Sequence, residues 1–128
     1  MLKKIIVTGG DGRFAQELKK SKNKEKFIFR SKNQLDILSI KSIEKNIKEF
    51  KPKYLLHLAG LSRPMSIHDD KINKSIDLNI IGTCNLVKIC ILKKIKLIFF
   101  STSYVYPGKK GNYKETDPIL PWNNYGWS

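Results

Sequence analysis

Hydrophobic residues in this chain form short continuous runs, and the segments between the runs carry apolar residues at helical spacing. Four runs predict strands: Ile5–Thr8, Phe27–Phe29, Tyr54–Leu58 and Leu97–Phe100. Each run is continuously apolar, as expected for strands of a sheet that helices cover on both faces. The pattern therefore predicts a buried parallel sheet.

Helices are predicted between these strands, where apolar residues recur three or four positions apart. The expected helices are Arg13–Lys20, Ser39–Phe50 and Ile72–Lys94, and Pro52 marks the end of the second. One face of the third helix carries a row of apolar residues: Ile76, Ile80, Cys84, Val87 and Ile91.

The alternation of strand and helix predicts an α/β fold, a Rossmann-like doubly wound parallel sheet that stops after its fourth strand. After Ser101 the chain is rich in Tyr, Pro, Gly, Lys and Asn, which is typical of a loop. At 128 residues the chain is one domain at most (1–128), long enough to bury a core. The fourth strand would be a sheet edge with uncovered apolar side chains, so a homo-oligomer formed through exposed apolar surface is expected.

The net charge of +14 is the unusual feature of the composition. A polyanion-binding face or a solvated Lys-rich surface would each explain it. Lys residues are spread over every helix and loop instead of forming a cluster. Specific recognition of phosphates and bases favours Arg, and Arg occurs only at Arg13, Arg30 and Arg63. We expect a mainly solvated surface, weak salt-sensitive binding to polyanions and no specific nucleic-acid partner.

The cysteines and the apolar runs indicate the compartment. Cys84 and Cys90 lie six residues apart and point to different helix faces, so both are predicted to be small buried hydrophobic residues without a mutual disulfide. No apolar stretch approaches the length of a membrane span, and the run that follows Met1 is too short for a signal peptide. A cytoplasmic location and no membrane partner are expected.

The segment TGGDGRFA connects the first predicted strand to the first helix. A tight turn and the close approach of a pyrophosphate both require residues without a Cβ, here Gly9 and Gly12. The helix N-terminus behind them offers free N–H groups and a positive dipole end. Because the pattern follows a strand and opens a helix, it predicts dinucleotide binding; a plain glycine-rich turn is the alternative.

The end of the second strand bears on the choice of cofactor. The acidic residue that usually holds the 2′-OH of NAD is missing there. Arg30, followed by Ser31 and Lys32, would hold a 2′-phosphate, unless Arg30 is one more surface cation. The predicted cofactor is NADP or NAD, with NADP slightly preferred.

Several motifs occur together in an order and spacing that resemble a known family. They are TGGDGRFA, LDI (Leu35–Ile37), HLAG (His57–Gly60), NIIGTCNL (Asn79–Leu86), STSYVYPG (Ser101–Gly108) and YGWS. The chain resembles the extended short-chain dehydrogenase/reductases, the NAD(P)-dependent epimerases, dehydratases and reductases of nucleotide sugars. FFSTSYVYPG and the segment YKETDPILPWNNYG are most similar to the dTDP-4-dehydrorhamnose reductases and their sugar-nucleotide-binding relatives. The resemblance covers the whole chain and implies a nucleotide-sugar substrate.

The resemblance also implies roles for single residues. The glycine turn would wrap the pyrophosphate, Asp36 and Ile37 would border the adenine, and the turn after the third strand would lie under the cofactor. With Arg30 included, the predicted cofactor-binding residues are Gly9, Gly12, Arg13, Phe14, Arg30, Asp36, Ile37, Leu58, Ala59, Gly60, Asn79 and Ser101. Ser103 and Arg63 are predicted to bind substrate, and no metal ligand is predicted.

Some of these residues have a structural interpretation as well. Asp36 would begin a turn, Asn79 would be a surface amide of a helix, and Thr102 would cap the turn that follows a strand. His57 is expected to be a buried strand-end residue and His68 to be solvated.

Thr102 and Tyr125 are the predicted catalytic residues. Reduction of a ketone transfers a hydride from nicotinamide to carbon and a proton to oxygen. By resemblance, Thr102 bonds the substrate oxygen and Tyr125, the Tyr of a Tyr-x-x-x-Lys motif, supplies the proton. Free Tyr has a pKa of about 10, which a neighbouring Lys and the cofactor's positive charge would lower. Ser103 stands where the related reductases commonly carry Asp, so the substrate and the reaction stay open.

The Lys of that motif would fall at position 129, one residue beyond the sequence. We therefore expect the N-terminal fragment of a longer nucleotide-sugar reductase, inactive by itself; a natural half-protein completed by another chain is the alternative. Two other functions stay open. One is a 4-epimerase or dehydratase of the same family, and the other is a non-enzymatic basic nucleotide- or RNA-binding module.

Overall fold

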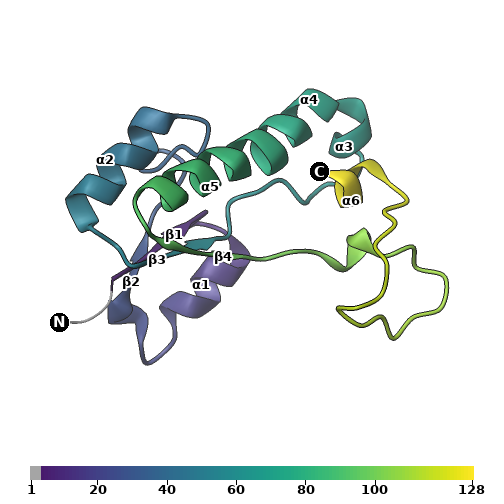
Figure 1. Cartoon of the computed structure of the whole chain (residues 1–128), viewed down its shortest axis with the longest axis horizontal. Coiled ribbons are helices and arrows are strands. Elements are labelled where there is room, and N and C mark those ends of the chain that lie inside the picture. The colour runs from purple at the N-terminus through teal and green to yellow at the C-terminus, as the bar shows by residue number, and fades with distance from the viewer. Residues whose placement is uncertain (1–3) are drawn as a thin grey trace.

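Four parallel strands form the centre of the computed structural model, which describes residues 4–128 (Figure 1). They are β1 (Ile5–Thr8), β2 (Phe27–Phe29), β3 (Tyr54–His57) and β4 (Lys96–Phe99), in the order β2-β1-β3-β4. All three pairings are parallel, which confirms the predicted Rossmann-like sheet. Residues 1–3, which belong to the predicted domain and to the apolar run after Met1, lie outside the described residues.

The strand order reverses beside β1. The chain leaves β1 on one side to form β2 and crosses to the other side to form β3. In open α/β sheets ligands bind outside the carboxyl ends of the strands at such a reversal. The topology therefore marks the ends of β1 and β3 as the place to look for a site.

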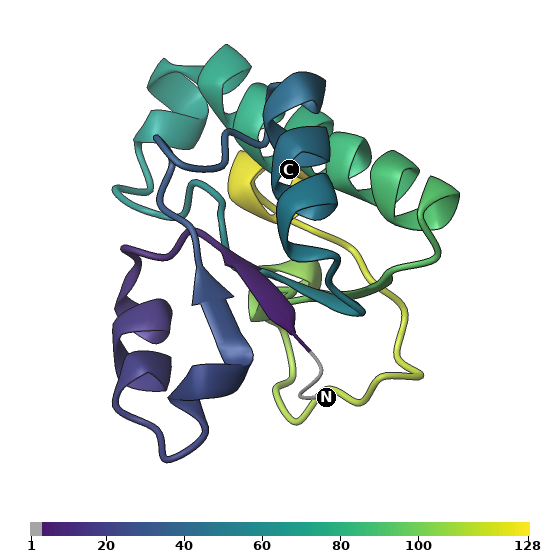
Figure 2. The same ribbon diagram turned by 90° about the vertical axis from the view of Figure 1, so that its left-hand side faces the viewer.

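Helices cover both faces of the sheet. α1 (Arg13–Lys19) lies on one face, and α2 (Ile40–Phe50) and α5 (Gly82–Leu92) lie on the other (Figure 2). Ser39 begins α2 by accepting the Ser42 N–H, and Lys51 ends it with a left-handed conformation. The core under α2 and α5 consists of aliphatic residues and one cysteine: Ile6, Leu35, Ile37, Ile43, Ile47, Leu55, Leu86, Ile89, Cys90 and Ile95.

α4 (Ile72–Ser75), η2 (Ile76–Ile81) and α5 form one continuous helix of 21 residues, in which η2 is a π-helical turn. Gly82 lets this helix approach the segment between β2 and α2, because a Cβ there would overlap the Ile37 side chain. By length and composition alone the helix could cross a membrane. The expectation that no segment reaches that length is therefore wrong, although the helix lies along the sheet in this fold.

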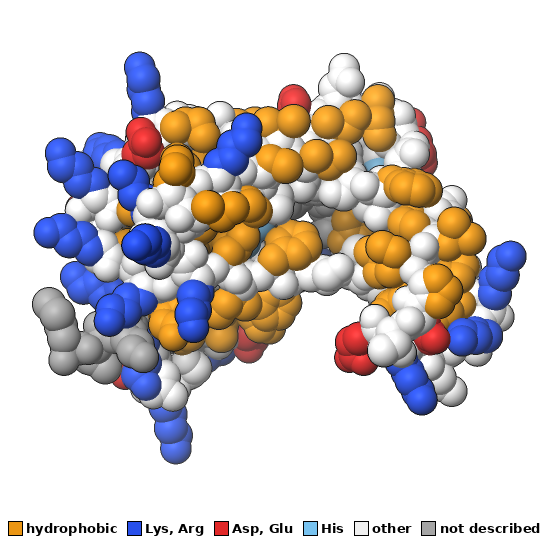
Figure 3. Space-filling view, viewed as in Figure 1, with side chains coloured by type: hydrophobic (Ala, Val, Ile, Leu, Met, Phe, Trp, Pro, Cys, Tyr) orange, Lys and Arg blue, Asp and Glu red, His pale blue; other side chains and the backbone are white. Residues whose placement is uncertain are grey.

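The predicted apolar face of the long helix points largely to solvent. Ile91 is 72% exposed and Cys84 is exposed, so the expectation that both cysteines are buried is correct only for Cys90. The helix buries the side that carries Leu86 and Ile89, because that side faces α2 and the sheet. Both cysteines are free thiols. Figure 3 shows the apolar surface that remains along the helix.

β4 is an edge of the sheet, as expected, since β3 is its only strand partner within residues 4–128. After β4 the chain forms a long loop with η3 (Ser103–Val105) and returns in α6 (Asn124–Trp127) beside α3 (Ile67–Asp70). Gly126 permits this return, because a Cβ there would overlap the Tyr104 carbonyl oxygen. The loop thereby brings α6 to the carboxyl ends of the strands.

Candidate functional site

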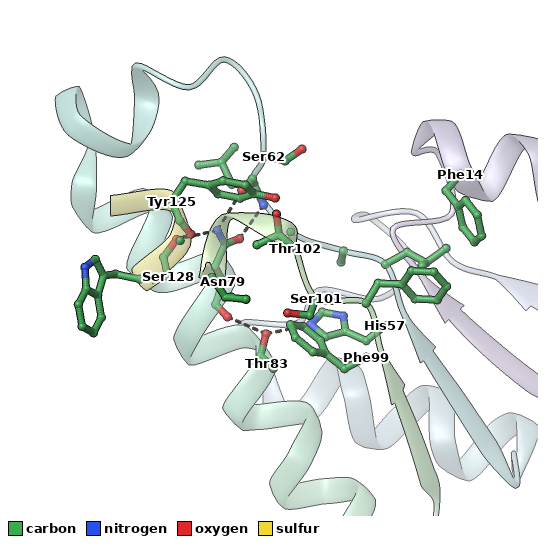
Figure 4. A pocket seen from close by; sticks show the side chains of 18 residues that line it. Phe14, His57, Ser62, Asn79, Thr83, Phe99, Ser101, Thr102, Tyr125 and Ser128 are labelled. Atoms are coloured by element: carbon green, nitrogen blue, oxygen red, sulfur yellow. Dashed lines mark hydrogen bonds between the residues drawn. The ribbon is translucent and has the colours of Figure 1, made fainter. Parts of the chain in front are cut away.

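A cavity of about 460 Å³ opens at the carboxyl ends of β3 and β4 (Figure 4). Its walls come from the turn after β3, the chain after β4, one side of the long helix, and α6. Within the described residues no Lys, Arg, Asp or Glu lines it. The cavity brings together eight predicted site residues: Phe14, Leu58, Ala59, Gly60, Asn79, Ser101, Thr102 and Tyr125.

The glycine turn lies next to this cavity, at the end of β1. Gly9 has a φ of +65°, and a Cβ there would stand 2.8 Å from the Ala59 nitrogen. Gly10 donates its N–H to the Arg30 carbonyl at 2.7 Å. Gly12 precedes α1, whose first turn has no side-chain cap. The turn thus requires glycine to pass the backbone after β3, and within the described residues it leaves the first N–H groups of α1 without a side-chain cap.

His57, at the end of β3, is 2% exposed and forms the floor of the cavity. Its Nδ1 lies 2.9 Å from Thr8 Oγ1, which also accepts the N–H groups of Leu58 and Ala59 at 3.2 and 3.1 Å. Because those two bonds use the lone pairs of Thr8, its O–H donates to His57 Nδ1. Thr8 and His57 together hold the turn after β3.

On its other side, His57 bonds the long helix. Nε2 lies 2.9 Å from Thr83 Oγ1, and Thr83 donates its own proton to the Asn79 carbonyl at 2.7 Å. Nε2 must then carry the imidazole proton, so His57 is the neutral Nε2–H tautomer. Desolvation by burial lowers the pKa of His57 to about 4, which keeps it neutral at pH 7. The prediction that His57 is a buried strand-end residue is confirmed.

Asn79, in η2, ties three segments together through its side chain. Oδ1 accepts the Leu61 N–H at 2.7 Å, and Nδ2 donates to the Leu61 carbonyl at 2.9 Å and to Ser128 Oγ at 3.1 Å. The amide is therefore no plain surface group. It lines the cavity but shapes it by holding the chain after β3 and α6 against the long helix.

Thr102 and Tyr125 line the cavity from different segments, and Figure 4 shows the Tyr125 ring next to the Thr102 side chain. Thr102 Oγ1 accepts the Tyr104 N–H at 3.3 Å and so caps η3, which leaves its O–H free to donate. The Tyr125 ring packs between His68 and Tyr104, with centroid distances of 4.7 and 5.3 Å. The structure thus places both predicted catalytic side chains at one opening.

Arg30 lies outside the cavity and is held by α2. Its guanidinium carbon lies 4.3 Å from the centroid of the Phe50 ring, and Nη2 lies 3.6 Å from the Glu49 carboxylate. The Arg30 side chain is largely buried by these contacts. It is therefore not the free surface cation of the alternative interpretation, and its guanidinium already has an anionic neighbour.

Asp36 and Ile37 support the fold. Asp36 Oδ1 accepts the Leu38 N–H at 3.0 Å, which forms the turn that the structural interpretation predicts. Ile37 is buried in the core. Three more predicted residues are exposed and lie outside the cavity lining: Arg13, Arg63 and Ser103.

His68 is buried, so the prediction that it is solvated is wrong. α3 packs against α6, and Asn124 in α6 donates to the Asp69 carboxylate at 2.8 Å. His68 is 1% exposed, with Nδ1 2.7 Å from Ser75 Oγ. His68 is buried because α6 packs against α3. The residues around SIHDD do not indicate this contact, since α6 lies far away along the chain.

Four hydroxyl residues around the cavity were missed by the sequence reasoning: Thr8, Ser75, Thr83 and Ser128. A signal existed for two of them, because Ser75, Asn79 and Thr83 recur every four positions and share one helix face. Within residues 4–128 no three His, Cys, Asp or Glu side chains are grouped to hold a metal ion.

The sheet order, the glycine turn and the cavity at the strand ends define a Rossmann-like α/β protein. Residues 3–128 match the family model described as RmlD substrate binding domain. The chain belongs to this family, and the predicted resemblance is confirmed.

Individual relatives agree with this assignment. dTDP-4-dehydrorhamnose reductase of Aggregatibacter actinomycetemcomitans is 26% identical over 98% of this chain and 44% of its own length. Methionine adenosyltransferase 2 subunit beta of Xenopus laevis is 32% identical over 77% of this chain and 28% of its own length. The structure of dTDP-4-dehydrorhamnose reductase from Bacillus anthracis in complex with NADP matches with a TM-score of 0.88, at 27% identity, over 99% of this chain and 46% of that one. The chain thus spans less than half the length of these relatives.

Proposed function

We propose that this chain is the cofactor-binding part of an NAD(P)-dependent nucleotide-sugar reductase. One observation supports this proposal most directly. Thr102 and Tyr125 share one cavity with the turn after β3, next to the glycine turn where the strand order reverses. The name of the Aggregatibacter relative supports the substrate class, and the NADP complex of the Bacillus relative supports a nicotinamide cofactor.

The residues of the glycine turn fit a dinucleotide. Gly9 occupies a place that a Cβ would fill against Ala59, and the first turn of α1 presents N–H groups without a side-chain cap. An anionic pyrophosphate is the kind of group that such N–H groups bind. Leu58 and Phe14 add apolar walls on which a flat ring would rest.

In the proposed reaction the bound cofactor supplies a hydride to the carbonyl carbon of the sugar. Tyr125 donates its phenolic proton to the carbonyl oxygen, and the Thr102 hydroxyl holds that oxygen in place. His57 moves no proton, because both ring nitrogens are bonded to threonine hydroxyls.

These 128 residues by themselves are proposed to bind the cofactor weakly and to reduce nothing. A phenol exchanges protons readily near pH 7 only where a cation favours its phenolate form. Within the described residues no Lys or Arg lines the cavity beside Tyr125. Measured reduction of dTDP-4-dehydrorhamnose by this chain with NADPH would contradict this part of the proposal.

NADP is proposed as the preferred cofactor over NAD. The NADP complex of the Bacillus relative supports it, whereas Arg30 supports it less than the sequence suggested, because Glu49 and Phe50 hold its guanidinium. Calorimetric titration of the chain with NADPH and with NADH checks this preference. Equal affinities for the two cofactors would contradict it.

A pair of glycine variants tests cofactor binding. Gly9→Ala should weaken NADPH binding roughly tenfold or more, or about 1.4 kcal/mol, because the new Cβ pushes the turn away from the backbone at Ala59. Gly111→Ala is the matched control: Gly111 also has a positive φ, of +73°, but nothing lies within 4 Å of its would-be Cβ. Equal NADPH affinities in the two variants would refute the proposed role of the turn.

Of the two alternative functions, one would use the same cavity and the other is supported by the name of a relative. A 4-epimerase of the same family would use the same cavity; a dehydratase also needs an acid and a base, and within the described residues no carboxylate lines the cavity. The Xenopus relative is named as a subunit of a different enzyme, which favours a non-enzymatic role. Filter binding to RNA against salt, with and without NADPH, separates that role: a steep salt dependence unaffected by NADPH would favour it.

A further inference from the structure

His68 is a buried histidine that the proposed reaction does not use. It lies in α3, which packs against α6, and its ring is tilted by 40° against the Tyr125 ring at a centroid distance of 4.7 Å. Its Nδ1 bonds Ser75 Oγ at 2.7 Å, and its buried Nε2 has no hydrogen-bond partner within residues 4–128. Buried polar groups are nearly always paired. A buried histidine with one bonded and one unbonded nitrogen therefore needs an explanation.

The hydrogen bonds beyond His68 run in one direction. Ser128 donates its single proton to the Tyr125 carbonyl at 3.2 Å. Ser75 therefore donates to Ser128 Oγ, at 3.0 Å, and has no proton left for His68. His68 must donate through Nδ1–H, which leaves Nε2 as the bare nitrogen. The chain of donors thus starts at His68 and ends at the backbone of Tyr125.

We propose that His68 is a positioning residue for Tyr125, which it holds through ring contact on one side and through the donor chain His68–Ser75–Ser128 on the other. This inference rests on the proposed function, because it takes Tyr125 as the proton donor. Asn79 reinforces the chain by donating to the same Ser128 hydroxyl at 3.1 Å (Figure 4). α3 and the long helix then hold the phenol in place together with α6, the four-residue helix that carries Tyr125.

The tautomer of His68 gives a test that a merely structural role would not pass. Imidazole ¹⁵N shifts should show Nδ1 protonated and Nε2 bare in the parent chain. Ser128→Ala frees the Ser75 proton to donate to Nδ1, so the shifts should move toward the Nε2–H form, two bonds away from the change. Ser66→Ala is the matched control, because its exposed side chain makes no cap bond in α3 and should change nothing. An Nε2–H tautomer in the parent, or unchanged shifts in Ser128→Ala, would overturn the proposal.

Two variants of His68 separate its two contacts. His68→Asn retains an N–H donor near the Nδ1 position and loses the ring; His68→Phe retains a ring and loses the donor. Each should weaken the nuclear Overhauser contact between Tyr125 and Tyr104, whose ring centroids lie 5.3 Å apart. An unchanged contact in both variants, with the fold intact by circular dichroism, would show that His68 does not position Tyr125.

NADPH titration of the parent chain keeps this inference separable from the proposed function. If the parent shows the Nδ1–H tautomer and responds to Ser128→Ala but binds no NADPH, the cofactor role fails and the donor chain stands. If it binds NADPH with His68 in the other tautomer, the donor chain fails and the cofactor role stands.

Discussion

Both histidines of this chain lie at the candidate site, His57 in the wall of the cavity and His68 against the Tyr125 ring, and they are held in different ways. At the floor, Thr8, His57 and Thr83 join β1, β3 and the long helix, and both nitrogens of His57 are bonded. At the rim, defined here as His68, Ser75 and Ser128, only one nitrogen of the histidine is bonded within residues 4–128. The floor is built from two strands and the long helix, whereas the rim joins the four-residue helices α3 and α6 to the first turn of the long helix.

The difference shows where rigidity is built into the site. A buried hydrogen-bond network in which every polar group is paired carries a small desolvation penalty and holds its side chains rigidly. In a partly paired network the side chains can shift more easily. The floor is therefore expected to hold the turn under the proposed cofactor firmly, and the rim is expected to hold Tyr125, the side chain proposed to move a proton, less firmly. Three measurements on stability probe this comparison.

The largest effect is expected from removing the floor histidine. His57→Phe fills a similar volume but leaves the Thr8 hydroxyl without its acceptor and breaks two hydrogen bonds, so we expect a loss of about 3 kcal/mol in the free energy of unfolding. His68→Phe breaks one bond and should cost about 1 kcal/mol. Urea unfolding compares the two variants. Equal losses would show that floor and rim are equally rigid.

A smaller effect is expected from acid, and it should come from the floor. The unfolded chain protonates His57 near its ordinary pKa of 6.5, whereas the folded chain does so only near a pKa of about 4. Stability from this group is therefore complete above pH 6.5 and is lost as the pH falls from 6.5 to 4. At pH 5 the loss should be about 2 kcal/mol.

Urea unfolding at pH 8 and pH 5 checks this expectation. The control is His57→Phe, which should lose this part of the acid sensitivity, while Ser66→Ala should keep it. An acid sensitivity that is the same in parent and His57→Phe would show that the His57 pKa is not lowered.

The smallest effect concerns the attachment of α6 to the rim. Asn124→Ala removes an exposed hydrogen bond to Asp69, so the free energy of unfolding should change by less than about 0.5 kcal/mol. Amide exchange of Ser128, which closes α6, should nevertheless become faster, because α6 loses a tether to α3. If exchange stays unchanged, the contact between Asp69 and Asn124 does not hold the rim.

Much of the fold could be predicted from local patterns. The four apolar runs became the four strands, because continuously apolar segments between helices have little choice but a buried sheet. The apolar stripe of Ser39–Phe50 became α2. The glycine turn was predictable too. A position with a positive φ, such as the +65° of Gly9, favours glycine, and the glycines can be recognised in the sequence.

The errors share a cause in contacts between distant segments. Cys84 was expected inside, yet the buried side of its helix is chosen by α2 and the sheet. His68 was expected in solvent, yet α6 covers it after a loop of more than twenty residues returns. The surroundings of Arg30 depend on distant segments as well, because Glu49 and Phe50 on α2 hold its guanidinium, and its predicted role at a phosphate stays a prediction.

The sequence by itself determined the kinds of element, their order along the chain and the glycine turn, because each depends on residues close together in the chain. Only the tertiary structure decided which hydroxyl meets which histidine nitrogen, and hence which tautomer each histidine carries. The physical reason is that a proton has one donor and needs one acceptor, and the acceptors of His57 and His68 come from segments that only folding brings within 3 Å.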